Sequence, residues 1–335
     1  MRAQLLNRLG RWETILAACV VTLIIISAIT TPGFLSALNI QTSISNMSDT
    51  ALMTLPLALL IITREIDISV ASIAGLSSSC AGLALSHHSS PAAAIAVALL
   101  AGLACGAFNG FCVTVLRLQS LVVTLGTLAL FRGLCYVLLG SNVITAIPAA
   151  LVNFTSASLL GTVLPLDILP FLVLAPLFAI ALHRMPTGRR IYAIGGNPAT
   201  AQYSGLRRGR IKFGLFAVSG LMSAIAGLIN MGLTSQASPD ALLGNELVVL
   251  TIVFLGGISF LGSKGRISGV VLALVLVISL TSVLQLRNVS SYAQGTAIGV
   301  LLIFSLLLSN MAREVSARVS NRRKRHRKQE ALQTS

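Results

Sequence analysis

Six polar or charged residues lie within or at the edges of long apolar runs of the sequence. They are Asn46, Asp49, Asn109, Thr124, Thr127 and Arg132. A charge at the centre of a membrane helix costs about 2.5–3.5 kcal/mol on insertion scales, so such residues are expected to face other helices or water. We predict that the uncharged members line a translocation pathway, and these are Asn46, Asn109, Thr124 and Thr127. For Asn109 and Thr124, a structural role is an equally good interpretation.

The two charged members of the set are interpreted differently. Arg132 is expected mainly to bind a structural partner, either a backbone carbonyl at a helix C-terminus or an acid, with a pathway role as the alternative. Asp49 is the one acid placed where proton coupling could use it. A single acid near the start of a helix is thin support for a proton-driven carrier, which therefore stays the alternative.

No enzyme or metal-site signature accompanies these residues. The sequence contains no GxxxxGK[ST] phosphate loop, no GxSxG and no HExxH. His87 and His88 are adjacent in a short connection, which points their side chains apart, so we expect no metal there. The five cysteines lie in apolar runs without metal-type spacing and are expected to be buried thiols. We therefore predict that the chain is no enzyme and binds no cofactor of its own.

The amino-acid composition indicates the kind of fold that positions these residues. Of 335 residues, 55% are apolar and only 10% are charged, and the mean hydropathy is +0.89. Soluble domains carry about 25% charged residues. Apolar runs of roughly 17–25 residues recur, each long enough to cross a hydrocarbon core of about 30 Å. We predict an all-α, polytopic transmembrane helix bundle of about ten helices, built as a single membrane domain over 14–310.

The apolar runs place ten helical segments. They span 14–32, 42–63, 68–86, 91–115, 119–140, 164–182, 213–233, 247–262, 268–286 and 293–310. The first is interpreted as a retained helix, because further hydrophobic spans follow it. The second begins with a polar run and contains Pro56, and the eighth is short and ends in Gly256 and Gly257. Broken or polar membrane helices are tolerated only against protein or water, so both are candidates for lining the pathway.

Basic residues predict the orientation. In a ten-helix arrangement, all but two of the 24 Lys and Arg residues fall on one side, in the tails and in alternate connections. The positive-inside rule then places both termini in the cytoplasm. An eight-helix arrangement with re-entrant segments would keep the same termini. We predict cytoplasmic tails at 1–13 and 311–335, and a basic run at 322–328 that contacts anionic membrane lipid and no nucleic acid.

Several glycines are spaced for close helix packing. Gly102, Gly106 and Gly110 recur every four residues, which makes a stripe where another helix backbone can approach closely. Gly256 and Gly257 are assigned to helix packing as well. Such stripes predict helix contacts and say little about a substrate.

The longest cytoplasmic connection is predicted at 183–212, where basic residues are mixed with glycines. A loop that only joined two helices could be much shorter. Asn197 directly precedes Pro198, a pair typical of a helix N-cap and first helical position. We therefore predict a short helix from Ala199 to Tyr203 within this loop.

Three blocks of the sequence, in order, carry extended motifs. The first, over 59–72, is Leu-Leu-Ile-Ile-Thr-Arg-Glu-Ile-Asp-Ile-Ser-Val-Ala-Ser. The second joins Asn109-Gly110 to Ser-Leu-Val-Val-Thr-Leu-Gly-Thr over 120–127 and to Arg132-Gly133. The third is Thr-Gly-Arg-Arg-Ile-Tyr-Ala-Ile-Gly-Gly-Asn-Pro-Ala-Thr-Ala over 187–201, followed by Ser204-Gly205 and by Leu-Gly-Gly-Ile-Ser-Phe-Leu-Gly-Ser-Lys-Gly over 255–265.

Together these blocks resemble those of the ribose/xylose/rhamnose/autoinducer-2 type permeases of bacterial ABC importers. The resemblance implies an inner-membrane permease subunit with the architecture of the vitamin-B12-type importers, moving a monosaccharide or similar small polyol. A second permease, identical or a sister chain, would complete the pore. ATP-binding subunits carrying ATP and Mg would sit on the cytoplasmic face, and a periplasmic sugar-binding protein would deliver the solute. The loop at 183–212 would carry the helix that docks in the ATPase. The residues assigned to this coupling are Gly188, Arg189, Gly195, Gly196, Asn197, Pro198, Ala199, Ala201 and Gly205.

The sequence also departs from the pattern of that family. Arg64-Glu65 and Ser263-Lys264 stand where Gly-Gly is common, and Ala71 replaces a usual glycine. These changes affect backbone geometry on the cytoplasmic side more than substrate choice. Two other classes stay open, a secondary ion-coupled carrier that works without an ATPase and a scaffold protein of the membrane.

Overall fold

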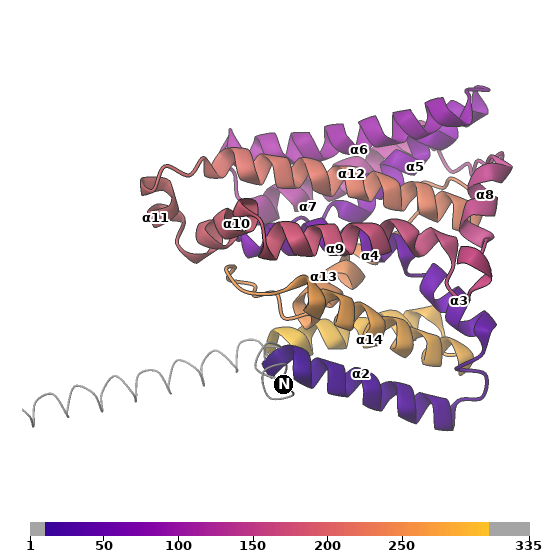
Figure 1. Ribbon diagram of the computed structural model, residues 1–335. Helices are drawn as coiled ribbons and strands as arrows, with labels where there is room; N and C mark the ends of the chain where they lie inside the picture. The colour runs from indigo at the N-terminus through magenta and orange to yellow at the C-terminus, as the bar shows by residue number, and fades with distance from the viewer. Residues whose placement is uncertain (1–10, 308–335) are drawn as a thin grey trace, which may run out of the picture.

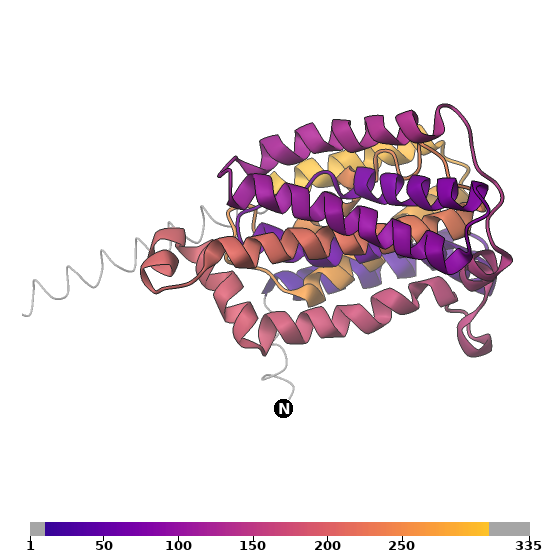
Figure 2. The ribbon, with the colours of Figure 1, turned by 90° about the horizontal axis from the view of Figure 1, so that it is seen from above.

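The structure is a computed structural model that describes residues 11–307 of the chain. These residues form an all-α bundle without a named β-strand (Figures 1 and 2). The elements are α2 (Arg11–Thr30), α3 (Ala37–Ser45), α4 (Ser48–Ile62), α5 (Val70–Ser86), α6 (Pro91–Thr114), α7 (Ser120–Leu139), α8 (Ala149–Ser156), η1 (Leu159–Gly161), η2 (Leu166–Ile168), α9 (Leu169–His183), α10 (Pro186–Gly196), α11 (Pro198–Tyr203), α12 (Arg208–Thr234), α13 (Asn245–Leu255), α14 (Ile267–Leu286) and a last helix over Ser291–Leu307.

Six helical segments of the described chain are long and apolar enough to cross a membrane. A seventh span results if α3 and α4, which are bent by 47° at their junction, count as one. Three shorter apolar helices accompany them, namely α5, α13 and Ser291–Leu307. The prediction of an all-α polytopic transmembrane bundle is therefore confirmed. The number of crossings and the orientation stay predictions, and the tail at 311–335 lies outside the described residues.

The second predicted helix is wrong in detail. In place of one helix over 42–63, α3 ends at Ser45 and α4 begins at Ser48. The backbone N–H of Met47 bonds to the carbonyl of Ile44, three residues back, and this tighter turn redirects the chain at the polar run. Pro56 lies inside α4 without ending it.

Three smaller predictions are corrected. The eighth helix ends at Leu255 and not at 262, because Gly257 adopts a left-handed conformation (φ +82°) that glycine reaches without strain. The seventh begins at Arg208 and not at 213, so the end of the predicted loop is helical. Cys19, expected to be buried, is exposed on α2, a helix with few neighbours.

Helix α4 forms the centre of the bundle. Every one of its residues is buried, including Leu52, Leu55 and Leu60, and it contacts α9, α12, α13 and α14. A helix that is apolar on all sides is stable only when it is surrounded. Because protein interiors are close-packed, α4 cannot shift without its neighbours.

Helices α6 and α12 approach each other through glycines. A Cβ atom placed on Gly106 would lie 2.3 Å from the carbonyl oxygen of Phe216, and one on Gly220 would lie 2.1 Å from that of Gly102. Gly110 lies near Phe213 in the same contact. The backbones therefore pack without intervening side chains, as small residues permit between membrane helices.

The second pair of predicted packing glycines lies in a different contact. A Cβ atom on Gly256 would lie 2.7 Å from Cα of Val270 in α14, and one on Gly257 would lie 2.5 Å from the Trp12 ring. The turn after α13 is thus fitted between α2 and α14.

The bundle has two distinct ends, and Figure 1 shows α10 and α11 at one of them and α8 at the other. We call the first the α11 end. The connections 63–69, 184–207 and 256–266 meet there through hydrogen bonds. At the opposite end Ile144 pairs with Ala237, and Arg287 donates to the hydroxyls of Thr30 and Thr31.

Candidate functional site

Helix α11 is formed by strictly local chemistry. Asn197 has an extended backbone, and its side-chain oxygen accepts from the N–H groups of Ala199 and Thr200 at 3.1 and 3.2 Å. Pro198 occupies the first helical position, where its missing N–H costs nothing. The helix thus begins one residue before the predicted start at Ala199, and Gly205, with φ +76°, turns the chain back after it.

The outer surface of α11 is exposed at the tip of the α11 end (Figure 1). Ala201 faces inward and is 4% exposed, whereas Tyr203, two residues later and so on the other side of the helix, is 92% exposed. Sequence reasoning used Tyr203 only as the end of the helix. An aromatic residue opposite the inward alanine of a capped helix is the signal that could have singled it out.

The nine residues assigned to coupling separate into two groups. Three of them are buried and cannot touch a partner, namely Gly188, Gly195 and Ala201. Five are exposed, namely Arg189, Gly196, Asn197, Ala199 and Gly205, and Pro198 is half-buried. A Cβ atom on Gly195 would lie 1.8 Å from the Ile62 carbonyl oxygen, so this glycine lets α10 touch the end of α4.

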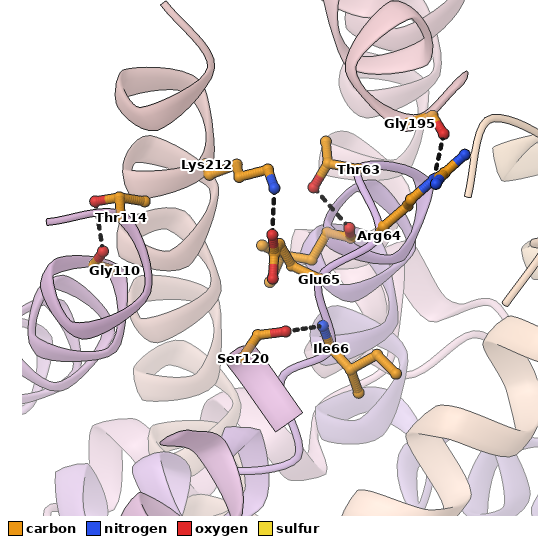
Figure 3. A network of polar contacts seen from close by, with 10 residues as sticks. Thr63, Arg64, Glu65, Ile66, Gly110, Thr114, Ser120, Gly195 and Lys212 are labelled. Atoms are coloured by element: carbon orange, nitrogen blue, oxygen red, sulfur yellow. Dashed lines mark hydrogen bonds and ion pairs between the residues drawn. The ribbon is translucent and has the colours of Figure 1, made fainter. Parts of the chain in front are cut away.

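Arg64, two residues after the end of α4, reaches the junction of α10 and α11 (Figure 3). Its Nε donates to the carbonyl of Gly195 at 2.6 Å, and its Nη2 donates to that of Gly196 at 2.9 Å. These carbonyls end α10, where a positive charge is favoured by the helix dipole. Arg64 thereby donates hydrogen bonds to two backbone carbonyls that have no partner within α10.

Glu65, the next residue, forms an ion pair with Lys212 in the first turns of α12 (Figure 3). The two side chains are only 12% and 16% exposed. A pair this far removed from water is screened much less than a surface pair. Two adjacent residues after α4 are therefore bonded on either side of α11, one to the end of α10 and the other to α12.

A third contact joins the connection 256–266 to the same place. The N–H of Ser263 donates to the Ile62 carbonyl at 2.9 Å, and the hydroxyl of Tyr192 in α10 donates to the Gly265 carbonyl at 2.7 Å. Burial raises the pKa of Tyr192, whose hydroxyl is protonated near neutral pH even at its ordinary pKa. Three residues that depart from the Gly-Gly pairs of the motif thus form contacts at the α11 end, namely Arg64, Glu65 and Ser263.

The rest of the 63–69 connection is held by side chains from two further helices. Thr124 of α7 donates its hydroxyl to the Ile66 carbonyl at 3.2 Å. Asn109 of α6 donates to the Ser69 hydroxyl at 2.8 Å. Two residues that we predicted to line a pathway therefore hold this connection, which fits the structural interpretation kept open for both.

The four predicted pathway residues do not gather around one cavity. Asn109 and Thr124 are fully buried, Thr127 is 5% exposed and lies one turn from Thr124, and Asn46 is exposed at the break between α3 and α4. They share neither an end of the bundle nor a common opening.

Buried acids are the feature that the search for pathway residues missed. Asp67 is fully buried and accepts from the hydroxyls of Ser69 and Ser219 at 2.6 and 2.9 Å. Asp167 accepts from Ser45. The pattern Asp-x-Ser at 67–69 is an Asx-turn signal that could have indicated the first of these.

The remaining charged residues of the initial set have structural partners. Nη1 of Arg132 donates to the carbonyls of Pro239 and Ala241 at 2.7 and 2.8 Å, which are backbone groups of a loop and not of a helix end. Asp49 accepts from the Asn230 side chain at 2.9 Å. Among the described residues, no group of three His, Cys, Asp or Glu side chains could hold a metal ion.

A cavity of about 820 Å³ opens beside these contacts at the α11 end. Its wall includes Arg64, Arg117, Arg208 and Lys212 but only one acid, Glu65. The four basic side chains thus make the recess next to α11 positively charged.

These features define a class: a multi-pass membrane protein in which one connection carries an exposed, capped helix at one end of the bundle. Residues 39–306 match the family described as "Branched-chain amino acid transport system / permease component". The match covers more than half of the chain, and the chain belongs to this family of permeases. It is a transport subunit.

Full-length relatives refine this assignment. The chain is 33% identical over 293 residues to the ribose import permease protein of Haemophilus influenzae, covering 87% of this chain and 90% of the relative. It is 34% identical over 299 residues to the ribose import permease protein of Escherichia coli K12, covering 88% and 92%. It is 32% identical over 302 residues to an autoinducer 2 import system permease protein of Photorhabdus laumondii, covering 88% and 90%. The resemblance stated from the motifs is confirmed. No solved structure matches the chain.

Proposed function

We propose that this chain is the membrane-spanning subunit of an ATP-driven importer that moves a monosaccharide or similar small polyol across the bacterial inner membrane. The observation that carries this proposal is the near full-length similarity to permeases named for ribose and autoinducer 2 import. Rhamnose is a further candidate from the motif comparison. Because the family description names branched-chain amino acids, leucine is the competing solute to test.

The proposed importer needs partner proteins that supply energy and deliver the substrate. An ATP-binding subunit carrying ATP and Mg docks on the α11 end, a periplasmic sugar-binding protein delivers the solute to the opposite end, and a second permease, identical or a sister chain, completes the pore. The burial of α4 on all sides supports a pathway formed between two chains, since the centre of this chain is filled. Both termini lie in the cytoplasm in this arrangement.

Helix α11 is the proposed docking element for the ATPase. Three features support it: the cap at Asn197, the exposed face ending in Tyr203, and the buried glycines that fix α10 to the core. A short rigid helix at a protein surface binds without first losing conformational entropy. The flanking basic recess favours an acidic groove on the partner.

The test is uptake of labelled ribose, rhamnose, autoinducer 2 and leucine in cells lacking this chain, with and without the chain restored. We expect loss of uptake of one sugar-type solute and unchanged leucine uptake. Loss of leucine uptake alone would overturn the substrate class. Uptake that persists after removal of the ATPase would favour the alternative, an ion-coupled secondary carrier, for which Asp49 is the candidate proton site.

A further inference from the structure

The α11 segment, residues 197–207, lies between two contacts that the neighbouring residues Arg64 and Glu65 make. Arg64 binds the carbonyls of Gly195 and Gly196 just before the segment, and Glu65 pairs with Lys212 in α12, five residues after it. Figure 3 shows both contacts leaving the end of α4 in different directions. Between the two attachments, α11 itself is exposed.

Both attachments are charge-assisted, and such hydrogen bonds are shorter and stronger than neutral ones. The Glu65–Lys212 pair is largely shielded from water. Removing one member of this partly buried pair leaves the other charge without its partner, so the contact resists partial opening. Arg64 holds two carbonyls with one planar group, which fixes direction as well as distance.

A displacement of α11 therefore has few ways to be absorbed. Either the attachments break, or the end of α4 moves with α11. Helix α4 is buried along its whole length, and Ile66, Asp67 and Ser69 beyond it are bonded to α7, α12 and α6. Packed elements of this kind shift as units between discrete arrangements and do not deform continuously.

We propose that Arg64 and Glu65 form a latch that transmits movement of α11 to α4 and the 63–69 connection, and so couples a partner docked on α11 to the membrane helices. The latch comprises Arg64, Glu65 and their partners Gly195, Gly196 and Lys212. This inference rests on the proposed docking of an ATPase at α11. Both contacts depend on the side chains at 64–65, because Gly-Gly, which is common there in the motif that this chain resembles, has no side chain that could form either of them.

The test uses the assembled importer in proteoliposomes and exchanges the charges of the ion pair. Glu65→Lys and Lys212→Glu each place like charges together, whereas the double exchange restores opposite charges. We measure the uptake of the sugar that the chain restores in cells, divided by the ATP hydrolysed. Because each single variant breaks the attachment, it should lower this ratio severalfold. The double variant should return to within about threefold of the wild type.

Arg210→Glu is the matched control. It makes the same charge reversal on the same helix, two residues from Lys212, at an exposed side chain. It should keep the wild-type ratio. Amide hydrogen exchange over residues 197–207 gives a second reading that does not depend on substrate, and it should be faster in the single variants and recover in the double variant.

Two results would overturn the latch: single variants with a wild-type ratio, or a double variant as poorly coupled as the single ones. If Glu65→Lys fails to assemble, Glu65→Gln, which keeps the shape of the side chain, replaces it. A reduced ratio there supports the latch, and an unchanged ratio contradicts it. The proposed function is judged separately, since it fails only if the wild-type complex shows no ATP-dependent uptake.

Discussion

The side-chain amide of Asn109 donates a hydrogen bond of 2.8 Å to Ser69 Oγ, and the hydroxyl of Ser69 in turn donates to Asp67 at 2.6 Å. A residue of α6 thus orders the start of α5 through an acid that is fully buried. Asn109 therefore stabilises the 63–69 connection, and its hydrogen-bond partner is a side chain of the same protein.

Asn109→Ala should therefore lower stability and leave substrate affinity unchanged. A hydrogen bond between membrane helices contributes about 0.6–2 kcal/mol, so we expect a modest fall in the melting temperature of the purified protein. The apparent affinity for the transported sugar should stay at the wild-type value. A wild-type melting temperature combined with altered affinity would instead return Asn109 to the pathway.

Replacing Gly220 by valine should separate α6 from α12. The new Cβ would lie 2.1 Å from the carbonyl oxygen of Gly102, a contact with backbone that no rotamer can relieve. Overpacking typically costs about 1–3 kcal/mol and more where backbone must move. We expect loss of monodisperse protein in size-exclusion chromatography. Gly126→Ala in α7, where nothing lies within 4 Å, is the control and should behave as wild type.

Tyr203→Ala should weaken binding of the ATPase without changing the stability of this chain. Exposed tyrosines that become buried in an interface commonly contribute about 2 kcal/mol, or roughly 30-fold in Kd. Affinity between the purified subunits measures the effect. Tyr292→Ala removes a side chain of equal exposure, 91%, at the opposite end and should leave ATPase affinity unchanged. Equal losses in both variants would remove α11 as the docking element.

Arg132→Met should loosen the connection after α12. The guanidinium is bonded to the carbonyls of Pro239 and Ala241, and methionine keeps the length of the side chain but not its donors. Amide hydrogen exchange over 235–244 should rise, while exchange over 197–207 at the α11 end stays unchanged. A rise at both ends would show that Arg132 stabilises the whole bundle and not one loop.

Local chemistry made the α11 region predictable from the sequence. The pair Asn197-Pro198 specifies a helix start by itself, because the cap bonds reach only two and three residues along the chain. Apolar runs likewise placed the helices, since a span of the membrane requires a long uninterrupted segment. The polar run at 42–46 was noted, but the break between α3 and α4 was not predicted, because it depends on a single tightened turn at Met47.

The partners of Asn109, Thr124, Arg64 and Glu65 could not be predicted in the same way. Each bonds to a residue at least 40 positions away, so its role depends on how the helices are rotated and stacked. Hydropathy fixes the length of a membrane helix but not its rotation about its axis. An amide facing a neighbouring hydroxyl and an amide facing a pathway therefore give the same sequence pattern.

The central claim is that a partner ATPase, acting through α11, drives this permease. The most direct measurement is solute uptake into proteoliposomes that contain this chain, its ATPase and the periplasmic binding protein, with ATP and Mg supplied on the ATPase side. We predict uptake that requires ATP hydrolysis and that falls in Tyr203→Ala vesicles while the ion gradient is unchanged. Uptake that follows an imposed proton gradient without ATP would contradict the account.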